Sequence, residues 1–176
     1  MERDEAVALI GAAVTDRGGV WADLGAGAGV FTLALAALLG PAGTVYAVDR
    51  DAAALRELAG SAMRADGSAT IRTIVGDFTE PVELPSLDGL LLANALHFVP
   101  YRDQPRVMRH VASLVTPGGP IVVVEYDRRA ANPWVPYPIS RAALATLAHS
   151  AGLGAPTVLA TQPSQYSGTI YSAVVR

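Results

Sequence analysis

Short apolar runs alternate with helix-like segments along the whole chain. Two of the runs, "GLLLANAL" and "IVVVEY", are almost continuously apolar, which is typical of strands buried on both faces of a parallel sheet. Helices between such strands cover the two faces. The predicted strands are 20–25, 44–49, 70–75, 88–94, 120–126, 156–162 and 168–175, and the predicted helices are 3–16, 29–39, 51–65, 104–115 and 140–151.

The connection between the last two predicted strands limits how they can pair. Only "PSQYSG" separates them, which is too short for a crossover, so they should form an antiparallel hairpin. The pattern therefore predicts an α/β fold, a doubly wound and mostly parallel sheet in one domain spanning residues 1–176. A ligand site is expected at the carboxyl ends of the strands. Asp103 is expected to cap the helix over 104–115.

Composition and charge exclude several classes of protein. The formal net charge is −3 and no block of Lys or Arg occurs, which argues against a nucleic-acid partner. The absence of cysteine excludes disulfides, thiolate metal sites and cysteine nucleophiles. The apolar runs are shorter than the roughly 18 residues of a membrane span, and three acids precede the first of them, unlike a signal peptide. We expect a cytoplasmic protein without a membrane span.

The stretch "ADLGAGAG" places three glycines, Gly25, Gly27 and Gly29, directly after the first strand. Glycine-rich turns of this kind bind nucleotides, but the dinucleotide fingerprint requires G-x-G-x-x-G/A. The sixth position is Val30 when counted from Gly25 and Thr32 when counted from Gly27. The fingerprint is therefore missing, which argues against a nicotinamide-dependent oxidoreductase.

Two acids end the second and third predicted strands. Asp49 lies 20 residues after Gly29, where a carboxylate suits the two vicinal hydroxyls of a ribose. Capping the helix over 51–65 is an alternative role for Asp49, although Asp51 could also do this. Asp77 in "VGDF" ends the third strand, and it could simply form a turn before Pro81.

The chain resembles the class I S-adenosylmethionine-dependent methyltransferases, especially the small-molecule group that includes ubiquinone and menaquinone methylases. The resemblance covers residues 18–176 and rests on "ADLGAGAG", "VYAVDRD", "VGDF", "LDGLLLANALHFV" and "LVTPGGPIVVVEYD", in this order. It implies a Rossmann-like sheet of seven strands in the order 3-2-1-4-5-7-6 with the last strand antiparallel. It also implies methyl transfer from S-adenosylmethionine to the O, N or C of a small molecule by in-line displacement, leaving S-adenosylhomocysteine. No metal is expected.

The resemblance also implies roles for particular residues at the methionyl and ribose parts of the cofactor. The backbone of Gly25, Gly27 and Gly29 would approach the methionyl part, with Asp23 near its amino group. The carbonyl of Asn94 would meet the same amino group. Asp49 would hold the ribose hydroxyls.

The adenine part has its own implied contacts. Arg50 would stack on one face of the base. Asp77 would accept a hydrogen bond from the exocyclic amine, and the backbone amide of Phe78 would meet a ring nitrogen.

Candidate catalytic and substrate residues follow the fourth and fifth predicted strands. His97 could act as a general base, or it could simply pack and hydrogen-bond locally. The loop 125–140 carries Tyr126, Trp134 and Tyr137, which could form a wall around the substrate. Alternatively, Trp134 covers the end of the sheet or a dimer contact.

Several methylase classes are disfavoured, and two alternative functions remain. Cysteine-dependent methylases are excluded by composition, and the Asp/Asn-Pro-Pro-aromatic motif of nucleic-acid amino-methylases is missing at Asn94-Ala95-Leu96-His97. Only 19 residues precede Val20 and no long insertion follows the fifth strand, so we expect an open substrate site or one completed by a second subunit in a homo-oligomer. The first alternative is a catalytically silent domain that binds S-adenosylmethionine as a partner or regulator. The less favoured one is an NAD-dependent oxidoreductase.

Overall fold

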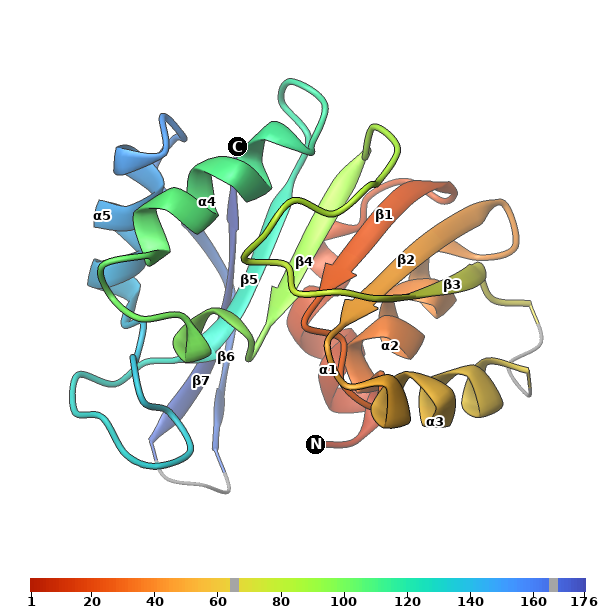
Figure 1. The fold of residues 1–176 in the computed structure, drawn as a ribbon, viewed down its shortest axis with the longest axis horizontal. Helices are drawn as coiled ribbons and strands as arrows, with labels where there is room; N and C mark the ends of the chain where they lie inside the picture. Colours follow the sequence, from red (N-terminus) through yellow and green to blue (C-terminus); the bar gives the residue numbers. More distant parts are fainter. Residues whose placement is uncertain (64–66, 165–167) are drawn as a thin grey trace.

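A seven-stranded sheet runs through the protein in the order β3-β2-β1-β4-β5-β7-β6 (Figure 1). A computed structural model describes residues 1–63, 67–164 and 168–176. The first five strands in this order, β3, β2, β1, β4 and β5, pair in parallel with their neighbours. Strand β7 is antiparallel to both β5 and β6. The predicted fold and strand order are confirmed. The strands are β1 (Gly19–Leu24), β2 (Gly43–Asp49), β3 (Thr70–Val75), β4 (Gly89–Ala93), β5 (Ile121–Tyr126), β6 (Thr157–Pro163) and β7 (Thr169–Val175).

Helices cover both faces of this sheet (Figure 1). One face is covered by α1 (Arg3–Ile10), α2 (Val30–Leu39) and α3 (Ala52–Ala62). The other is covered by α4 (Gln104–Ser113) and α5 (Arg141–Ser150). The loop 76–88 joins β3 to β4 on the face of the sheet that α4 and α5 cover. Phe78, Val82 and Leu84 of this loop pack against the core there.

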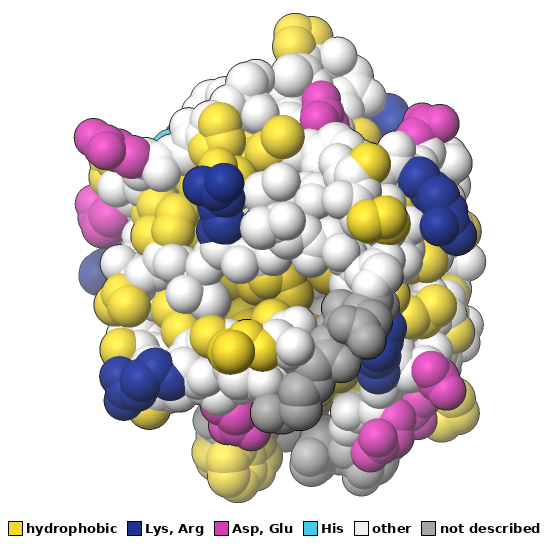
Figure 2. Space-filling view, turned by 90° about the vertical axis from the view of Figure 1, so that its right-hand side faces the viewer, with side chains coloured by type: hydrophobic (Ala, Val, Ile, Leu, Met, Phe, Trp, Pro, Cys, Tyr) yellow, Lys and Arg dark blue, Asp and Glu magenta, His cyan; other side chains and the backbone are white. Residues whose placement is uncertain are grey.

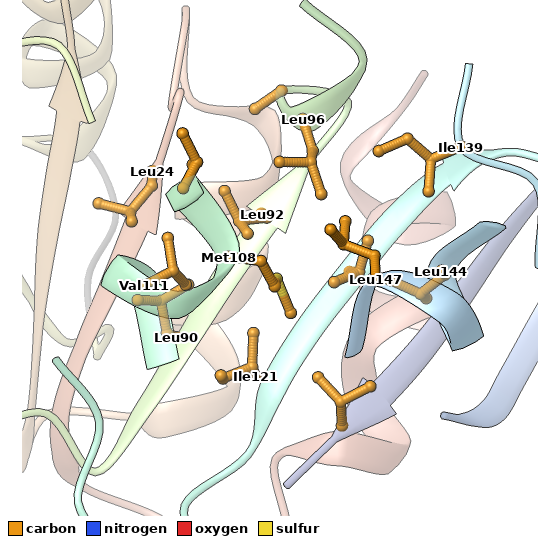
Figure 3. Close-up of a cluster of buried hydrophobic side chains, with 14 of the residues drawn as sticks. Leu24, Leu90, Leu92, Leu96, Met108, Val111, Ile121, Ile139, Leu144 and Leu147 are labelled. Atoms are coloured by element: carbon orange, nitrogen blue, oxygen red, sulfur yellow. The ribbon is translucent and has the colours of Figure 1, made fainter. Parts of the chain in front are cut away.

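The residues of β4 explain why its sequence is almost continuously apolar. All five are buried, and successive side chains point to opposite faces of the sheet. Leu90 and Leu92 face α4 and α5, where they join Met108 and Leu147 in one core (Figure 3). Leu91 belongs to the core under α1 and α2.

Three predicted helices run two or more residues past the C-terminal ends of the observed ones. The helix predicted over 3–16 ends as an α-helix at Ile10 and continues only as the 3₁₀ turn η1 (Gly11–Ala13). The helix over 104–115 ends at Ser113, because Leu87 forms a parallel bridge with Val115 and accepts the N–H of Thr116. The helix over 51–65 ends at Ala62, and residues 64–66 lie outside the described chain. A further 3₁₀ turn, η2 (Leu96–Phe98), was not predicted.

The expected cap of α4 is absent. Asp103 occupies the N-cap position, but its side chain makes no capping hydrogen bond, and Oδ2 lies 3.4 Å from Nε of Arg102. The backbone of Asp103 is helical, with φ −97° and ψ −20°, whereas a capping residue needs an extended backbone. Ser140 has that conformation, and its hydroxyl accepts the N–H of Ala143 at the start of α5.

The face at the β3 edge has a mixed charge. Arginine and acidic side chains lie apart from one another around it, with apolar side chains between them (Figure 2). Among the residues that the structure describes, no helix combines the length and the apolar character needed to cross a bilayer.

Candidate functional site

The carboxyl ends of β1, β2, β3 and β4 border a cavity of about 390 Å³, which we name the first cavity. All the predicted cofactor residues except Asp23 and Gly29 line it. These are Gly25, Gly27, Asp49, Arg50, Asp77, Phe78 and Asn94. Phe98 also contributes to its wall.

The three glycines of the turn after β1 have different surroundings. A Cβ at Gly29 would overlap Cδ1 of Leu58, so this glycine allows α3 to pack against the turn. A Cβ at Gly25 would lie 2.5 Å from Cβ of Ala95, which follows β4. A Cβ at Gly27 would meet nothing within 4 Å. Of the three, Gly27 is therefore the one that lines the first cavity and whose missing side chain leaves open space, so that a ligand can approach its backbone.

Asp49 connects the glycine turn to the start of α3. Its Oδ2 accepts the N–H of Gly27 at 2.7 Å, and its Oδ1 accepts the N–H of Asp51 at 2.8 Å. The cap of α3 is Asp51, whose carboxylate accepts the N–H groups of Ala53 and Ala54. The alternative role of Asp49 as the helix cap is therefore wrong. Each oxygen of Asp49 keeps a further lone pair for a ligand hydroxyl.

Asp77 forms the turn that was considered as an alternative role for it. Its Oδ1 accepts the N–H of Thr79 at 2.9 Å and the Thr79 hydroxyl at 2.7 Å. Partial burial acts to raise the pKa of Asp77, but the bonds from Thr79 outweigh it and leave the pKa below its usual value. The carboxylate is therefore charged and fixed in place at the wall of the first cavity.

Asp23 is buried at the end of β1 and is only half satisfied. Its Oδ2 accepts the Thr32 hydroxyl at 2.6 Å, whereas Oδ1 has no partner among the described residues. Burial raises the pKa of Asp23 to about 7, the Thr32 bond opposes this, and the charge of Asp49 adds to it. An unpaired buried oxygen of this kind requires an explanation, such as a water or a ligand donor nearby.

Asn94 carries a second unpaired oxygen at the end of β4. Its Oδ1 is buried without a partner in the described chain, although its backbone N–H reaches the carbonyl of Val124. Its φ is +53°, which is uncommon for a residue other than glycine. Strained backbone conformations are often found at functional sites.

A second cavity of about 430 Å³ adjoins the first, and we name it the second cavity. Asn94 and Phe98 line both cavities. The rest of its wall combines the residues after β4 with the loop after β5, so that His97, Tyr126 and Trp134 meet there. The remaining lining residues are Arg128, Asn132 and Val135.

Tyr137 lies apart from the other predicted substrate residues. It lines neither cavity, and its ring meets that of Tyr101 edge-on at 5.4 Å. Its backbone N–H donates to the carbonyl of His97, so it anchors the loop after β5. Trp134 lines the second cavity, and 77% of its surface is exposed. This exposure excludes the alternative that Trp134 covers the end of the sheet.

His97 lies in η2 and is buried against Glu125 of β5. Nδ1 of His97 is 2.7 Å from Oε2 of Glu125, and the backbone N–H of His97 donates to Oε1 at 3.1 Å. The sequence reasoning did not include Glu125. The available signal was a charged residue in the otherwise apolar run "IVVVEY".

The part of the chain that the structure describes contains no group of three or more His, Asp or Glu side chains that could hold a metal ion.

Residues 22–119 match a family model described as a methyltransferase domain. No curated protein matches the sequence. Among solved structures, the chain is similar to an arsenic(III) S-adenosylmethionine methyltransferase from Chlamydomonas reinhardtii, with a TM-score of 0.72 and 22% identity over 91% of this chain and 63% of that one.

Two other similar structures are covered more completely. One is the 1,6-didemethyltoxoflavin-N1-methyltransferase of Burkholderia thailandensis, crystallised with 1,6-didemethyltoxoflavin and S-adenosylhomocysteine. Its TM-score is 0.70 and its identity 22%, over 98% of this chain and 77% of that one. The other is a SAM-dependent methyltransferase from Aquifex aeolicus, with a TM-score of 0.71 and 13% identity over the whole of both chains.

These structural similarities show a shared fold, and the chain spans less than two thirds of the Chlamydomonas protein. The family model matches more than half of the chain. The chain therefore belongs to the methyltransferase-domain family and has the fold of the S-adenosylmethionine-dependent methyltransferases.

Proposed function

We propose that this chain transfers the methyl group of S-adenosylmethionine to a small-molecule acceptor. The observation that carries the proposal is the shared wall of the two cavities at Asn94 and Phe98. In this proposal the first cavity takes the cofactor, which membership of the methyltransferase-domain family supports. The acceptor would then occupy the second cavity, and the two would meet at the shared wall.

The residues of the first cavity fit this cofactor. Asp49 offers both carboxylate oxygens to ribose hydroxyls, and Gly27 leaves room for close approach. The unpaired Oδ1 of Asn94, in the cavity wall, is an acceptor suited to an ammonium group, and that of Asp23, which does not line the cavity, is suited to a bound water. Arg50 and Phe78 offer flat groups that suit an adenine.

The chain's own contribution would be alignment and exclusion of water. S-adenosylmethionine, when bound, supplies a methyl group that its sulfonium already activates, so no metal is required. Asn94 and Phe98 are placed to hold the acceptor against the cofactor, and Tyr126 and Val135 keep the second cavity apolar. Orientation of two bound reactants is a large source of rate enhancement.

The acceptor proposed here is an organic small molecule rather than arsenic. The similar Chlamydomonas protein is an arsenic methyltransferase, but this chain contains no cysteine. The Burkholderia protein was crystallised with a flat heterocycle, which is the kind of molecule that the apolar second cavity suits.

A silent cofactor-binding domain is the second candidate. The observation in its favour is the exposure of two lining residues of the second cavity, since Phe98 is 54% and Trp134 is 77% exposed. A second copy of the chain, in a homo-oligomer, would cover them if the enzyme is active. Turnover separates the two candidates.

Calorimetric titration with S-adenosylhomocysteine and with NAD tests the cofactor assignment. We expect S-adenosylhomocysteine to bind and NAD not to bind. Asp49→Ala should weaken binding by about 100-fold or more, because hydrogen bonds to a charged group are worth roughly 1.5–3 kcal/mol each. Asp16→Ala, which removes an exposed acid that borders neither cavity, is the matched control. Absence of S-adenosylhomocysteine binding at millimolar concentration would overturn the proposal.

A panel of phenols, quinols, amines and carboxylates then tests turnover. Methylation of any one of them, read by mass spectrometry as the gain of one CH₂, supports an active enzyme. Binding of S-adenosylhomocysteine without turnover of any of them supports the silent domain.

A further inference from the structure

His97 and Glu125 form the one buried, hydrogen-bonded pair of ionisable side chains that the described chain places beside a cavity. Glu125 is fully buried in β5, and His97 is 2% exposed. Both carboxylate oxygens of Glu125 accept hydrogen bonds from His97, one from the ring and one from the backbone N–H. A buried carboxylate is costly unless it is well hydrogen-bonded. The pair therefore holds the ring of His97 in one orientation.

The carboxylate also determines which ring nitrogen carries the proton. An ionised carboxylate can only accept hydrogen bonds, so Nδ1 of His97 must be the donor. In the neutral imidazole, Nε2 is then left with a free lone pair. Within the described residues, Nε2 makes no hydrogen bond and is not enclosed. Because His97 lines the second cavity, Nε2 is the ring atom available to a molecule bound there.

The second cavity suits a flat aromatic molecule. The ring of Phe98 lies 4.3 Å from that of His97 and the ring of Tyr126 lies 5.9 Å from it. Trp134 and Val135 add further apolar surface. His97 is next to Phe98 in η2, and Phe98 also lines the first cavity. A group beside Nε2 is therefore close to the wall where the two cavities meet.

The presence of a free base limits the kind of group that is methylated. A carboxylate is already ionised at neutral pH, and a neutral amine attacks through its own lone pair. A weakly acidic hydroxyl is a poor nucleophile until its proton is removed, and a positioned base accelerates such a step by roughly 10²–10⁴-fold.

We propose that His97 is the general base, that Glu125 is the residue that positions it, and that the acceptor is a flat aromatic molecule with a weakly acidic hydroxyl group. This inference rests on the proposed methyl transfer. The hydroxyl proton passes to Nε2 of His97, and the acceptor oxygen forms a bond to the methyl carbon. The bond between this carbon and sulfur breaks, and its electron pair stays on sulfur. His97 then releases the proton to solvent.

Two acceptors of different acidity test the base. In a mildly alkaline assay 2-naphthol stays largely protonated, whereas 4-nitrophenol is largely ionised and needs no base. His97→Gln should lower kcat by about 100-fold or more with 2-naphthol and by less than about threefold with 4-nitrophenol. KM should change little. Glu125→Gln should show the same selectivity with a smaller loss, about tenfold.

The matched control is His149→Gln, which makes the same change at an exposed position of α5. It should leave kcat unchanged with both acceptors. An equal loss with both acceptors in His97→Gln, or no loss with 2-naphthol, would overturn the inference. Methylation of amines or carboxylates but not phenols would also overturn it, while the proposed function would stand.

The ring of His97 can be observed without turnover. Nitrogen-15 NMR of labelled histidine should show a proton on Nδ1, and Glu125→Gln should abolish this preference. Addition of 2-naphthol to protein loaded with S-adenosylhomocysteine should shift the Nε2 resonance. A proton on Nε2 in the free protein, or no response to 2-naphthol, contradicts the inference. Failure of S-adenosylhomocysteine to bind contradicts the proposed function instead.

Discussion

The walls of the two cavities are built in different ways. The first cavity is formed by the turns directly after β1, β2, β3 and β4, and most of the polar contacts of its predicted residues are local, such as Asp77 with Thr79, while Asp49 reaches Gly27 on the neighbouring turn. The second cavity needs η2 and the loop after β5, and the residues that join them are 28 and 40 positions apart, His97 with Glu125 and His97 with Tyr137. The site at the strand ends is therefore encoded in short motifs. The neighbouring site depends on which distant segments the fold brings together.

The loop after β5 also differs from the glycine turn in how it is held. Asp127 and Arg141 bridge its two ends at 2.6 Å, and Asn132 accepts the N–H groups of Trp134 and Val135 within it. Both sets of contacts are partly exposed to solvent, where such interactions are worth little. The wall of the second cavity should therefore tolerate substitution better than the glycine turn.

Substitution of Gly29 should give the largest loss of stability. Gly29→Ala places a Cβ against Leu58 at a φ of +88°, so strain and overpacking add to about 3 kcal/mol of lost unfolding free energy. Gly27→Ala is the matched variant, with a φ of +53° and no neighbour within 4 Å, and should cost about 1 kcal/mol. Urea denaturation measures both values.

Calorimetry should reverse the order of these two glycine variants. The Cβ of Gly27→Ala enters the space on the cavity side, so S-adenosylhomocysteine should bind roughly tenfold more weakly or worse. Equal effects of the two substitutions on stability and on binding would remove the distinction between packing and ligand approach at this turn.

Asp23 should make the stability of the protein depend on pH. Its pKa is raised from 3.8 to about 7 by burial, so between these values the folded chain holds a proton that the unfolded chain has lost. The free energy of unfolding should therefore fall as the pH rises from about 4 to about 7. We expect a change on the order of 4 kcal/mol, since one pKa unit corresponds to about 1.4 kcal/mol, measured by urea denaturation across this range.

Two variants check the origin of this dependence. Asp23→Asn should flatten it and be more stable than the wild type above pH 7. Thr32→Val removes the hydrogen bond that lowers the pKa of Asp23. The decrease in the free energy of unfolding should therefore extend to higher pH. A constant difference between wild type and Asp23→Asn over the whole range would contradict the raised pKa.

Trp134 should affect the acceptor and not the cofactor. Because 77% of its surface is exposed, Trp134→Ala should change stability by no more than about 0.5 kcal/mol. Loss of aromatic contact in the second cavity should raise the KM for 2-naphthol by roughly three- to tenfold. Steady-state kinetics measures this change.

A control for Trp134 is available at the start of β6, level with the amino end of β5 and away from the loop after β5. Val158→Ala removes an apolar side chain of β6 that is 43% exposed and lines neither cavity. It should leave KM and S-adenosylhomocysteine affinity unchanged. If Trp134→Ala weakens S-adenosylhomocysteine binding as much as acceptor binding, the two cavities do not act separately.

The difference between local contacts and contacts of distant segments also explains which features could be predicted from the sequence. The strand order and the meeting of most of the predicted residues at one cavity could be predicted, because parallel strands end at one edge and each motif follows its strand directly. Glu125 is not predictable as a partner of His97, because only the packing of η2 over β5 brings them together.

The role of Gly29 shows a second limit. Its place in the motif predicts contact with a ligand, whereas the structure shows contact with Leu58 on α3. The end of α4 could not be predicted for a similar reason, because it depends on the bridge between Leu87 and Val115, which are 28 positions apart. A local sequence pattern can show that the type of residue at a position is restricted, but it does not show which neighbour imposes the restriction.

The N-caps of α4 and α5 are local features, and they give the smallest expected effect. Ser140 caps α5, whereas Asp103 stands at the start of α4 without a capping bond. Ser140→Ala should therefore cost about 1 kcal/mol of unfolding free energy, and Asp103→Ala should stay within about 0.5 kcal/mol. Urea denaturation of both variants distinguishes the two helices. A larger loss for Asp103→Ala than for Ser140→Ala would mean that Asp103 caps α4 in solution. The local sequence, rather than the fold, would then determine how α4 begins.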